Sequence, residues 1–432
     1  MLTKVKGLLQ NAVKKGFFHI LLGNTLVKFI TFFSSMLLPR ILTKQEFGRL
    51  GFADNVYSYI LLINGLGLAN AVLRFASVAQ DKGERQAVLA YSLRMGLLFD
   101  CLLTLCLLPV LIFAPLPLDG TRRFLFFILF MPFFTFAFDC ITYYLRASLE
   151  NRKFSVLTVF YSLVSAGLQL LLAMKFRVFG VFGARYTALL LAVAVGGFFL
   201  YKLYKNNENQ QKQPCFVLSR DYKSSLFRFS LAALVANAFS LVMPLNEQFV
   251  ITLLLKNEES VAGYRAASMA AQNIQFITMS VVVFIYPYFA RHDGDGRWLW
   301  KNCKKVIGGL SLGIGALTAL AILLTPAIVS LVYGNKYSDI VPLMRFMWVT
   351  FGINAVFRMP VGNILASMGL VRFNLIVSLC SAAVHLALDV VCIYFLGING
   401  AAVALTIVYT GAAAAGLIYF RHICKKREAA PV

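Results

Sequence analysis

Residues 17–38 read FFHILLGNTLVKFITFFSSMLL, an apolar run with a few small polar side chains and one lysine at its centre. A helix of this length rises roughly 30 Å, the thickness of the hydrocarbon core of a bilayer. The run is too long for the apolar region of a signal peptide, and no small-residue cleavage site follows it. We therefore predict that it is a retained transmembrane helix.

The whole chain has the same character. Of its 432 residues, 59% are hydrophobic and 14% are charged, whereas a soluble domain is nearer half apolar and a quarter charged. Inside a bilayer the backbone satisfies its own hydrogen bonds as helices or as a closed barrel, and a barrel shows short alternating segments instead of long apolar runs. The sequence predicts an all-α integral membrane protein.

About twelve such segments follow one another, with short loops between them. They lie near residues 17–39, 51–72, 89–114, 123–145, 154–174, 179–201, 229–254, 263–288, 306–332, 339–365, 374–396 and 399–420. The longest polar stretch, Tyr204–Lys223, divides six segments from six. We predict an N-terminal lobe over residues 1–210 and a C-terminal lobe over residues 211–432.

The two halves also share short motifs in the same order and at nearly the same shift along the chain. The matched pairs are Ala147–Leu149 with Ala366–Met368, Gly180–Ala184 with Gly397–Ala401, and Gly48 with Gly263. An even number of spans per half predicts two parallel six-helix lobes, related by a pseudo-two-fold axis along the membrane normal around a central cavity. Such repeats are typical of transporters that bind substrate between the lobes.

Lysine and arginine residues predict the orientation. With the N-terminus inside, the inner loops and termini hold 27 of them and the outer loops 11, and three of the 41 lie within spans. Positive charge gathers on the cytoplasmic side of membrane proteins, so we expect both termini in the cytoplasm of a multi-pass protein. This bias also explains most of the net charge of +23 without nucleic acid.

No catalytic, cofactor or metal motif stands out. The eight cysteines form no CxxC pair, and no GxxxxGK loop is present. We therefore expect no disulfide or zinc framework, no ATP hydrolysis, no cofactor and no enzymatic activity.

Polar side chains form stripes on several spans. In the first span Asn24, Lys28, Thr31 and Ser35 share one helical face. Lys28 lies about ten residues, or roughly 15 Å, from either interface, too far for its side chain to reach water. An ionisable group at this depth indicates a functional site, and the alternative is a buried lysine paired with a carboxylate.

The first two spans of the second half carry similar stripes. They are Asn237, Ser240, Pro244 and Glu247 in the seventh span, and Tyr264, Ser268, Gln272 and Gln275 in the eighth. Asp54, Ser58 and Gly65 form a poorer stripe in the second span, which Leu61 interrupts. These faces line a shared water-filled cleft or, alternatively, form interhelical hydrogen bonds in a dry bundle.

Two further pairs of polar residues lie one helical turn apart. Asn354 and Arg358 are close to Pro360 in the tenth span, and His385 and Asp389 occur in the eleventh. The second pair is either a proton relay or a locally satisfied structural pair.

Residues 38–50, LPRILTKQEFGRL, resemble the opening signature of the polysaccharide transporter family, the O-antigen and capsule repeat-unit flippases. Residues 145–154 and 261–264 are also similar to that family, which belongs to the multidrug/oligosaccharidyl-lipid/polysaccharide exporter superfamily. Glu247 occupies a place where these proteins often have aspartate. The resemblance covers nearly the whole chain in the number and order of spans.

The resemblance implies alternating access in a bacterial cytoplasmic (inner) membrane, with an undecaprenyl-pyrophosphate-linked oligosaccharide as cargo. Buried cations suit a pyrophosphate, and amides and hydroxyls suit sugars. The expected substrate-binding residues are Lys28, Asn24, Thr31, Asn237, Ser240, Gln272, Gln275 and Arg358. Asp54 and Glu247 are candidates for coupling to a proton or sodium gradient. Membrane lipid, a polysaccharide polymerase and glycosyltransferases are the expected partners.

Three other classes of protein stay open. A multidrug exporter of the same superfamily would need carboxylates and aromatic side chains facing the cleft to bind cationic drugs, whereas the central charge of the first span is Lys28. A polysaccharide polymerase or glycosyltransferase would need a long outer loop, but the predicted outer loops have roughly ten residues or fewer. A passive scaffold would not need buried charges in two repeated halves.

Overall fold

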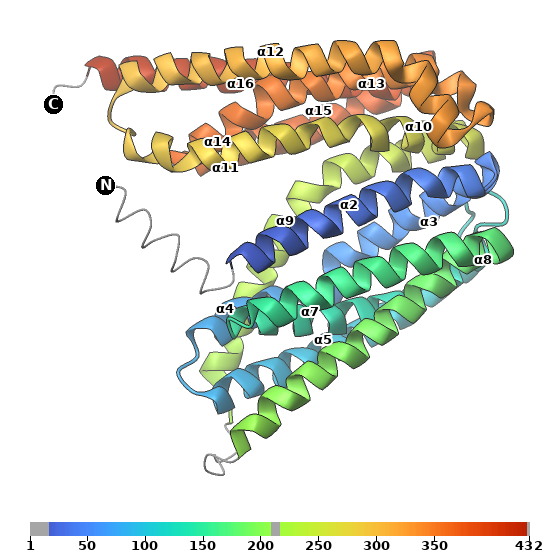
Figure 1. Cartoon of the computed structure of the whole chain (residues 1–432), viewed down its shortest axis with the longest axis vertical. Coiled ribbons are helices and arrows are strands. Elements are labelled where there is room, and N and C mark those ends of the chain that lie inside the picture. The colour runs from blue at the N-terminus through green and yellow to red at the C-terminus, as the bar shows by residue number, and fades with distance from the viewer. Residues whose placement is uncertain (1–16, 209–216, 430–432) are drawn as a thin grey trace. The chain divides into compact units, whose positions relative to one another are not determined.

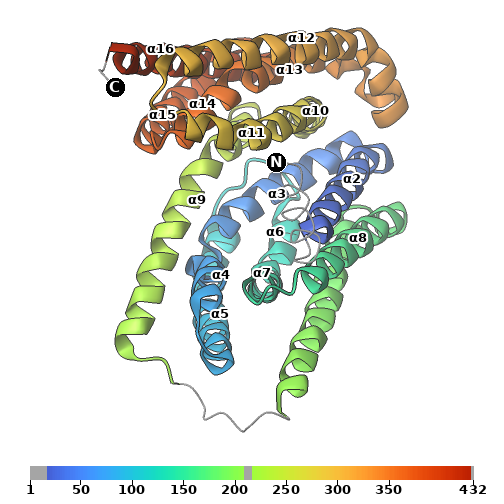
Figure 2. The ribbon, with the colours of Figure 1, turned by 60° about the vertical axis from the view of Figure 1, so that its left-hand side comes forward.

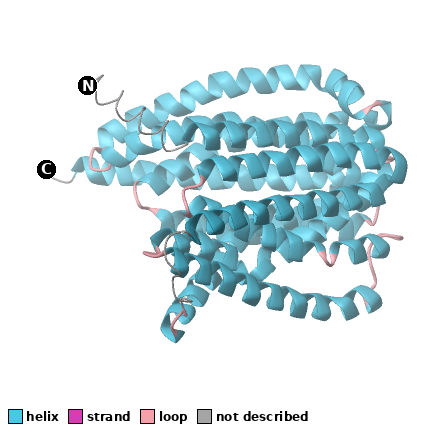
Figure 3. Ribbon diagram, turned by 60° about the horizontal axis from the view of Figure 1, so that its bottom comes forward, coloured by secondary structure: helices cyan, strands magenta, loops and turns pink. Residues whose placement is uncertain are grey.

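A computed structural model describes residues 17–208 and 217–429 of the chain. Within these ranges every regular element is a helix and no strand occurs (Figure 3). The prediction of an all-α membrane protein is therefore confirmed. Ten of the described helical segments are long and apolar enough to cross a membrane.

The first half of the chain contains one set of helices. They are α2 (Phe17–Ile41), α3 (Lys44–Ile63), η1 (Asn64–Gly67), α4 (Leu68–Val78), α5 (Lys82–Phe113), α6 (Arg122–Ile128), α7 (Met131–Ala147) and α8 (Asn151–Glu208). The 58 residues of α8 would measure about 87 Å as one straight helix, far more than a bilayer. The helix is broken at Arg177, so α8 supplies two spans.

The second half begins with α9 (Arg220–Leu255), whose 36 residues also exceed the length of one span. It continues through α10 (Glu258–Ala271), η2 (Gln272–Ile274), α11 (Gln275–Arg291), α12 (Gly296–Ile328), η3 (Val329–Tyr333), η4 (Asn335–Ile340), α13 (Val341–Ile353), η5 (Asn354–Arg358), α14 (Met359–Ser367), α15 (Val371–Leu396) and α16 (Ile398–Ala429). With α8 counted twice and α9 included, the described residues provide twelve spans, in agreement with the prediction.

Two compact units emerge from the contacts. Unit 1 comprises residues 1–46 and 53–238, and unit 2 comprises residues 47–52 and 239–432. In unit 1, α2 packs along α8, and α7 packs against α4, α5 and α8 (Figures 1 and 2). The lobes predicted at residues 1–210 and 211–432 stay a prediction.

Backbone breaks recur in the two halves. Residues with positive φ occur at Gly120 and Leu149 in the first half, and at Gly334 and Gly369 in the second. Gly334 follows Gly120, and Gly369 follows Leu149, at nearly the same offset along the chain as the sequence motifs. Each of these two pairs therefore marks equivalent helix ends. The internal repeat seen in the sequence is therefore present in the backbone.

The helical hairpin at Arg177 corrects one of the sequence matches. Arg177 has φ 55° and ψ −134°, and Gly397, at the corresponding break of the second half, has φ 60° and ψ −141°. Gly180 and Gly400 each let the second helix pass close to a carbonyl oxygen of the first. Gly180 thus corresponds to Gly400 and not to Gly397, because both are sites of close helix approach, and Gly397 corresponds to Arg177.

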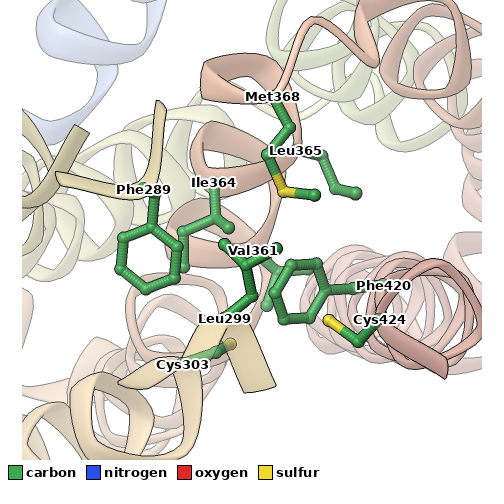
Figure 4. Close-up of a cluster of buried hydrophobic side chains, with 9 residues drawn as sticks. All are labelled: Phe289, Leu299, Cys303, Val361, Ile364, Leu365, Met368, Phe420 and Cys424. Atoms are coloured by element: carbon green, nitrogen blue, oxygen red, sulfur yellow. The ribbon is translucent and has the colours of Figure 1, made fainter. Parts of the chain in front are cut away.

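At one end of unit 2 a buried apolar cluster joins four helices. Figure 4 shows it between α11, α12, α14 and α16. Its members are Phe289, Leu299, Cys303, Val361, Ile364, Leu365, Met368, Phe420 and Cys424. The ends of these four helices are therefore fixed against one another by apolar packing.

Candidate substrate and cation sites

The polar stripe of α2 lies on a different face from its most exposed apolar side chains. Leu22, Phe29 and Phe33 are each more than half exposed. At 100° per residue the centre of these positions lies roughly 140° around the helix from the centre of Asn24 and Lys28. An exposed apolar face suits lipid, so the face with Lys28 points away from that surface.

The members of this stripe differ in what their side chains do. Asn24 and Lys28 are both exposed. The hydroxyl of Thr31 donates hydrogen bonds to the carbonyl oxygens of Val27 at 2.8 Å and Lys28 at 3.1 Å. Thr31 therefore retains only acceptor capacity for a ligand.

In the second half, the predicted amide residues lie beside a break in the helix. Gln272 is exposed and Gln275 is half-buried, and the 3₁₀ segment η2 separates α10 from α11 between them. Asn237 is exposed on α9. The side chain of Ser240 lies outside the described residues. The structure thus presents three of these four predicted polar side chains without bringing them into one described cluster.

Arg358 lies in a π-helical segment, η5, which is inserted between α13 and α14. Its guanidinium donates a long hydrogen bond of 3.4 Å to Oδ1 of Asn354 and lies 5.2 Å from the ring centre of Tyr409 on α16. Segments of π-helix are rare and are frequent at functional sites. The aromatic face holds the cation without neutralising it, so its positive charge stays available to an anion.

Asp54 forms an ion pair with Arg185 that no pattern in the sequence predicts. Both carboxylate oxygens of Asp54 accept from the Arg185 guanidinium, one of them at 3.1 Å. The two side chains are only 17–18% exposed. Nearby, the hydroxyls of Tyr57 and Thr135 lie 2.6 Å apart. Asp54 therefore belongs to a polar network that joins α3 to α8.

Glu247 lies beside the pair that the sequence suggested in the eleventh span. Its Oε1 is 4.0 Å from Nε2 of His385, and Nδ1 of His385 is 3.3 Å from Oδ2 of Asp389. All three side chains are buried. The one-turn spacing revealed His385 and Asp389 in the sequence. No local pattern links them to Glu247, because Glu247 lies on α9, which is far from α15 along the chain.

These features define a multi-pass membrane protein with repeated helical units and buried charges. Solved structures share this fold. An inward-facing multidrug resistance MATE family transporter of the MOP superfamily matches with a TM-score of 0.72 at 16% identity, with 94% of this chain and 96% of that chain covered. The Lipid II flippase MurJ in an inward closed conformation matches with a TM-score of 0.70 at 13% identity, covering 95% and 90%. At these identities the likeness concerns the fold.

The sequence itself gives the family. The profile of the polysaccharide biosynthesis protein family matches residues 13–292, well over half of the chain. No curated protein sequence matches the chain. The chain belongs to the polysaccharide biosynthesis protein family.

Proposed function

We propose that the protein is a flippase that moves a polyprenyl-pyrophosphate-linked oligosaccharide, such as an O-antigen or capsule repeat unit, across the bacterial cytoplasmic membrane. The observation that carries this proposal is the combination of family and fold. A polysaccharide biosynthesis protein built from membrane helices on a transporter fold is suited to moving a lipid-linked intermediate. The solved relative MurJ is named as a flippase of Lipid II.

The chemistry of the cargo fits the described side chains. A pyrophosphate must lose water to cross the membrane, and a cation that replaces this water offsets the cost. Each unit offers one predicted cation, Lys28 on α2 and Arg358 on η5. The amides of Asn24, Asn237, Gln272 and Gln275 are the proposed partners of sugar hydroxyls, together with Thr31 and Ser240. The polyprenyl tail stays in lipid.

Alternating access is the proposed mode of transport, with both termini in the cytoplasm. Glu247 is the better of the two coupling candidates, because the carboxylate of Asp54 is engaged by Arg185. The proposed driving ion is a proton or sodium, and no cofactor or catalytic step is invoked. The proposed partners are an undecaprenyl-linked glycan, a polymerase and glycosyltransferases.

A second candidate function is drug export, since MATE transporters share the fold. Lys28 at the centre of the α2 polar face argues against an organic cation as cargo, because like charges repel. Uptake of an organic cation by proteoliposomes of the purified protein, unchanged by Lys28→Ala, would favour this second function.

The experiment that tests the flippase proposal is complementation of a strain that lacks the protein. Lys28→Ala should abolish surface glycan display and cause the lipid-linked glycan to accumulate, because the pyrophosphate loses its cation. Lys28→Arg should restore part of the display. Lys175→Ala, at an exposed position of α8, serves as the matched control and should display normally. Normal display by Lys28→Ala at equal membrane abundance would refute a binding role for Lys28.

A further inference from the structure

The cluster of Glu247, His385 and Asp389 is buried inside unit 2. Their exposed fractions are 5%, 1% and 0%. One potential ligand atom from each residue lies within 4.8 Å of the other two. Glu247 comes from α9, and the other two residues share one face of α15. Three ionisable groups are therefore held together away from water.

Within the described part of the chain, this cluster has unsatisfied polar atoms. Both ring nitrogens of His385, both carboxylate oxygens of Asp389 and Oε1 of Glu247 form no hydrogen bond there. Buried polar groups are nearly always paired, and a buried charge is costly unless it is neutralised. Two adjacent carboxylates with such unsatisfied atoms indicate a site for positive charge.

The surrounding groups do not supply that charge directly. Tyr264 of α10 and Tyr409 of α16 are neighbours of Glu247. Arg358 of η5 reaches the ring of Tyr409. Both tyrosines are neutral donors, and among the described residues the Arg358 guanidinium forms no ion pair with the cluster. The positive charge must therefore come from a bound cation or from protons.

The position of the imidazole distinguishes these alternatives. The two carboxylates face different ring nitrogens, Asp389 at Nδ1 and Glu247 at Nε2. A metal ion would gather both carboxylates at one ring nitrogen, and hard cations prefer an all-oxygen shell. An imidazolium instead donates from both nitrogens at once, which suits one carboxylate on each side.

We propose that Glu247, His385 and Asp389 form a proton-binding site in which His385 passes a proton between the two carboxylates. Asp389 gives its proton to Nδ1 while Nε2–H gives its proton to Glu247, so the ring returns to its neutral state as the other tautomer. Chains of this residue composition are used as proton relays in transporters. The role of the proton as the driving ion of the flippase rests on the proposed function. Proton binding at this site does not depend on that function.

The test uses the full-length protein in nanodiscs without any lipid-linked glycan, with isotope-labelled histidine. The chain has four histidines, and His385→Gln assigns the signal of interest. The His385 imidazole signal should titrate with pH identically in sodium chloride and in choline chloride, and zinc chloride should leave it unchanged. Glu247→Gln and Asp389→Asn should each move the midpoint to lower pH by about one unit or more, because each variant removes a carboxylate beside the imidazolium.

His422→Gln is the matched control, because His422 is exposed on α16, and it should leave the His385 titration unchanged. A saturable effect of sodium, or a zinc-induced signal from one coordinated ring nitrogen, would show that the cluster binds a metal ion and would overturn the proton site. A signal that does not respond to pH would overturn the proposal. If a variant fails to fold, the comparison of salts in the wild-type protein still decides. If the protein fails to support glycan display in cells while the His385 signal titrates as expected, only the proposed function is refuted.

Discussion

The pair of Asp54 and Arg185 joins residues that are far apart in the sequence, through two hydrogen bonds between their side chains. A bidentate pair of guanidinium and carboxylate has a fixed geometry, so it sets the rotation of α3 relative to the second part of α8. Loss of one partner leaves the other charge largely buried. At the residue scale we therefore assign to Asp54 mainly a structural contribution.

This assignment predicts a loss of stability when either partner is removed. Asp54→Ala and Arg185→Ala should each lower the free energy of unfolding by about 3 kcal/mol, since each leaves an uncompensated charge. The double variant should lose less than the sum of the two single losses, because no unpaired charge remains. Thermal unfolding of the purified protein measures these differences.

Lys153→Ala provides the control for that prediction. Lys153 pairs with Glu150 at 3.1 Å, but both side chains are about one-third exposed. Exposed pairs contribute about 0–1 kcal/mol, so the melting temperature should hardly change. Additive losses in the Asp54 and Arg185 double variant would contradict the proposed direct coupling.

At the scale of elements, helix breaks determine how each span begins and ends. The break at Arg177 is stabilised from α2, because its guanidinium donates to the carbonyl oxygen of Ile41 at 2.7 Å. The positive φ of Arg177 is unfavourable for a residue with a side chain. The equivalent position in the second half is Gly397, which adopts this conformation freely. One hairpin geometry is thus reached by a capping contact in one half and by glycine in the other.

The glycines after these breaks lead to a matched prediction. A Cβ atom at Gly180 would lie 2.1 Å from the carbonyl oxygen of Leu172, and one at Gly400 would lie 2.0 Å from that of Cys392. Gly180→Ala and Gly400→Ala should each lower the free energy of unfolding by about 1–3 kcal/mol, because the backbones of the two helices must move apart. Melting temperatures of the purified variants measure the effect.

Gly183→Ala is the control from the same helix. No atom lies within 4 Å of a Cβ built there, so the substitution should be neutral or slightly stabilising. If Gly183→Ala destabilised the protein as much as Gly180→Ala, the close approach to the Leu172 carbonyl oxygen would not explain the loss at Gly180.

At the scale of the whole molecule, the distribution of charge predicts which side of the membrane each end occupies. A fluorescent protein fused to the C-terminus should fluoresce, and alkaline phosphatase at the same place should be inactive, because both results require a cytoplasmic position. Alkaline phosphatase inserted in the loop 115–121 should be active. Active phosphatase at the C-terminus would reverse the predicted orientation.

Much of the architecture follows from the amino-acid sequence alone. Long apolar runs must become helices in a bilayer, and the spacing of polar residues within one helix fixes the face they share. For this reason the twelve spans, the α2 stripe with Lys28 and the pair of His385 and Asp389 were all predictable. Each of these features depends on residues within one segment.

Tertiary structure alone decided which segments meet. Arg185 beside Asp54, Glu247 beside His385, and Tyr409 beside Arg358 each bring together side chains from different helices that are distant in the sequence. No periodicity encodes such contacts, because they depend on how helices pack and rotate against one another. The register of the internal repeat likewise became clear only from the backbone, where close approach distinguished Gly400 from Gly397.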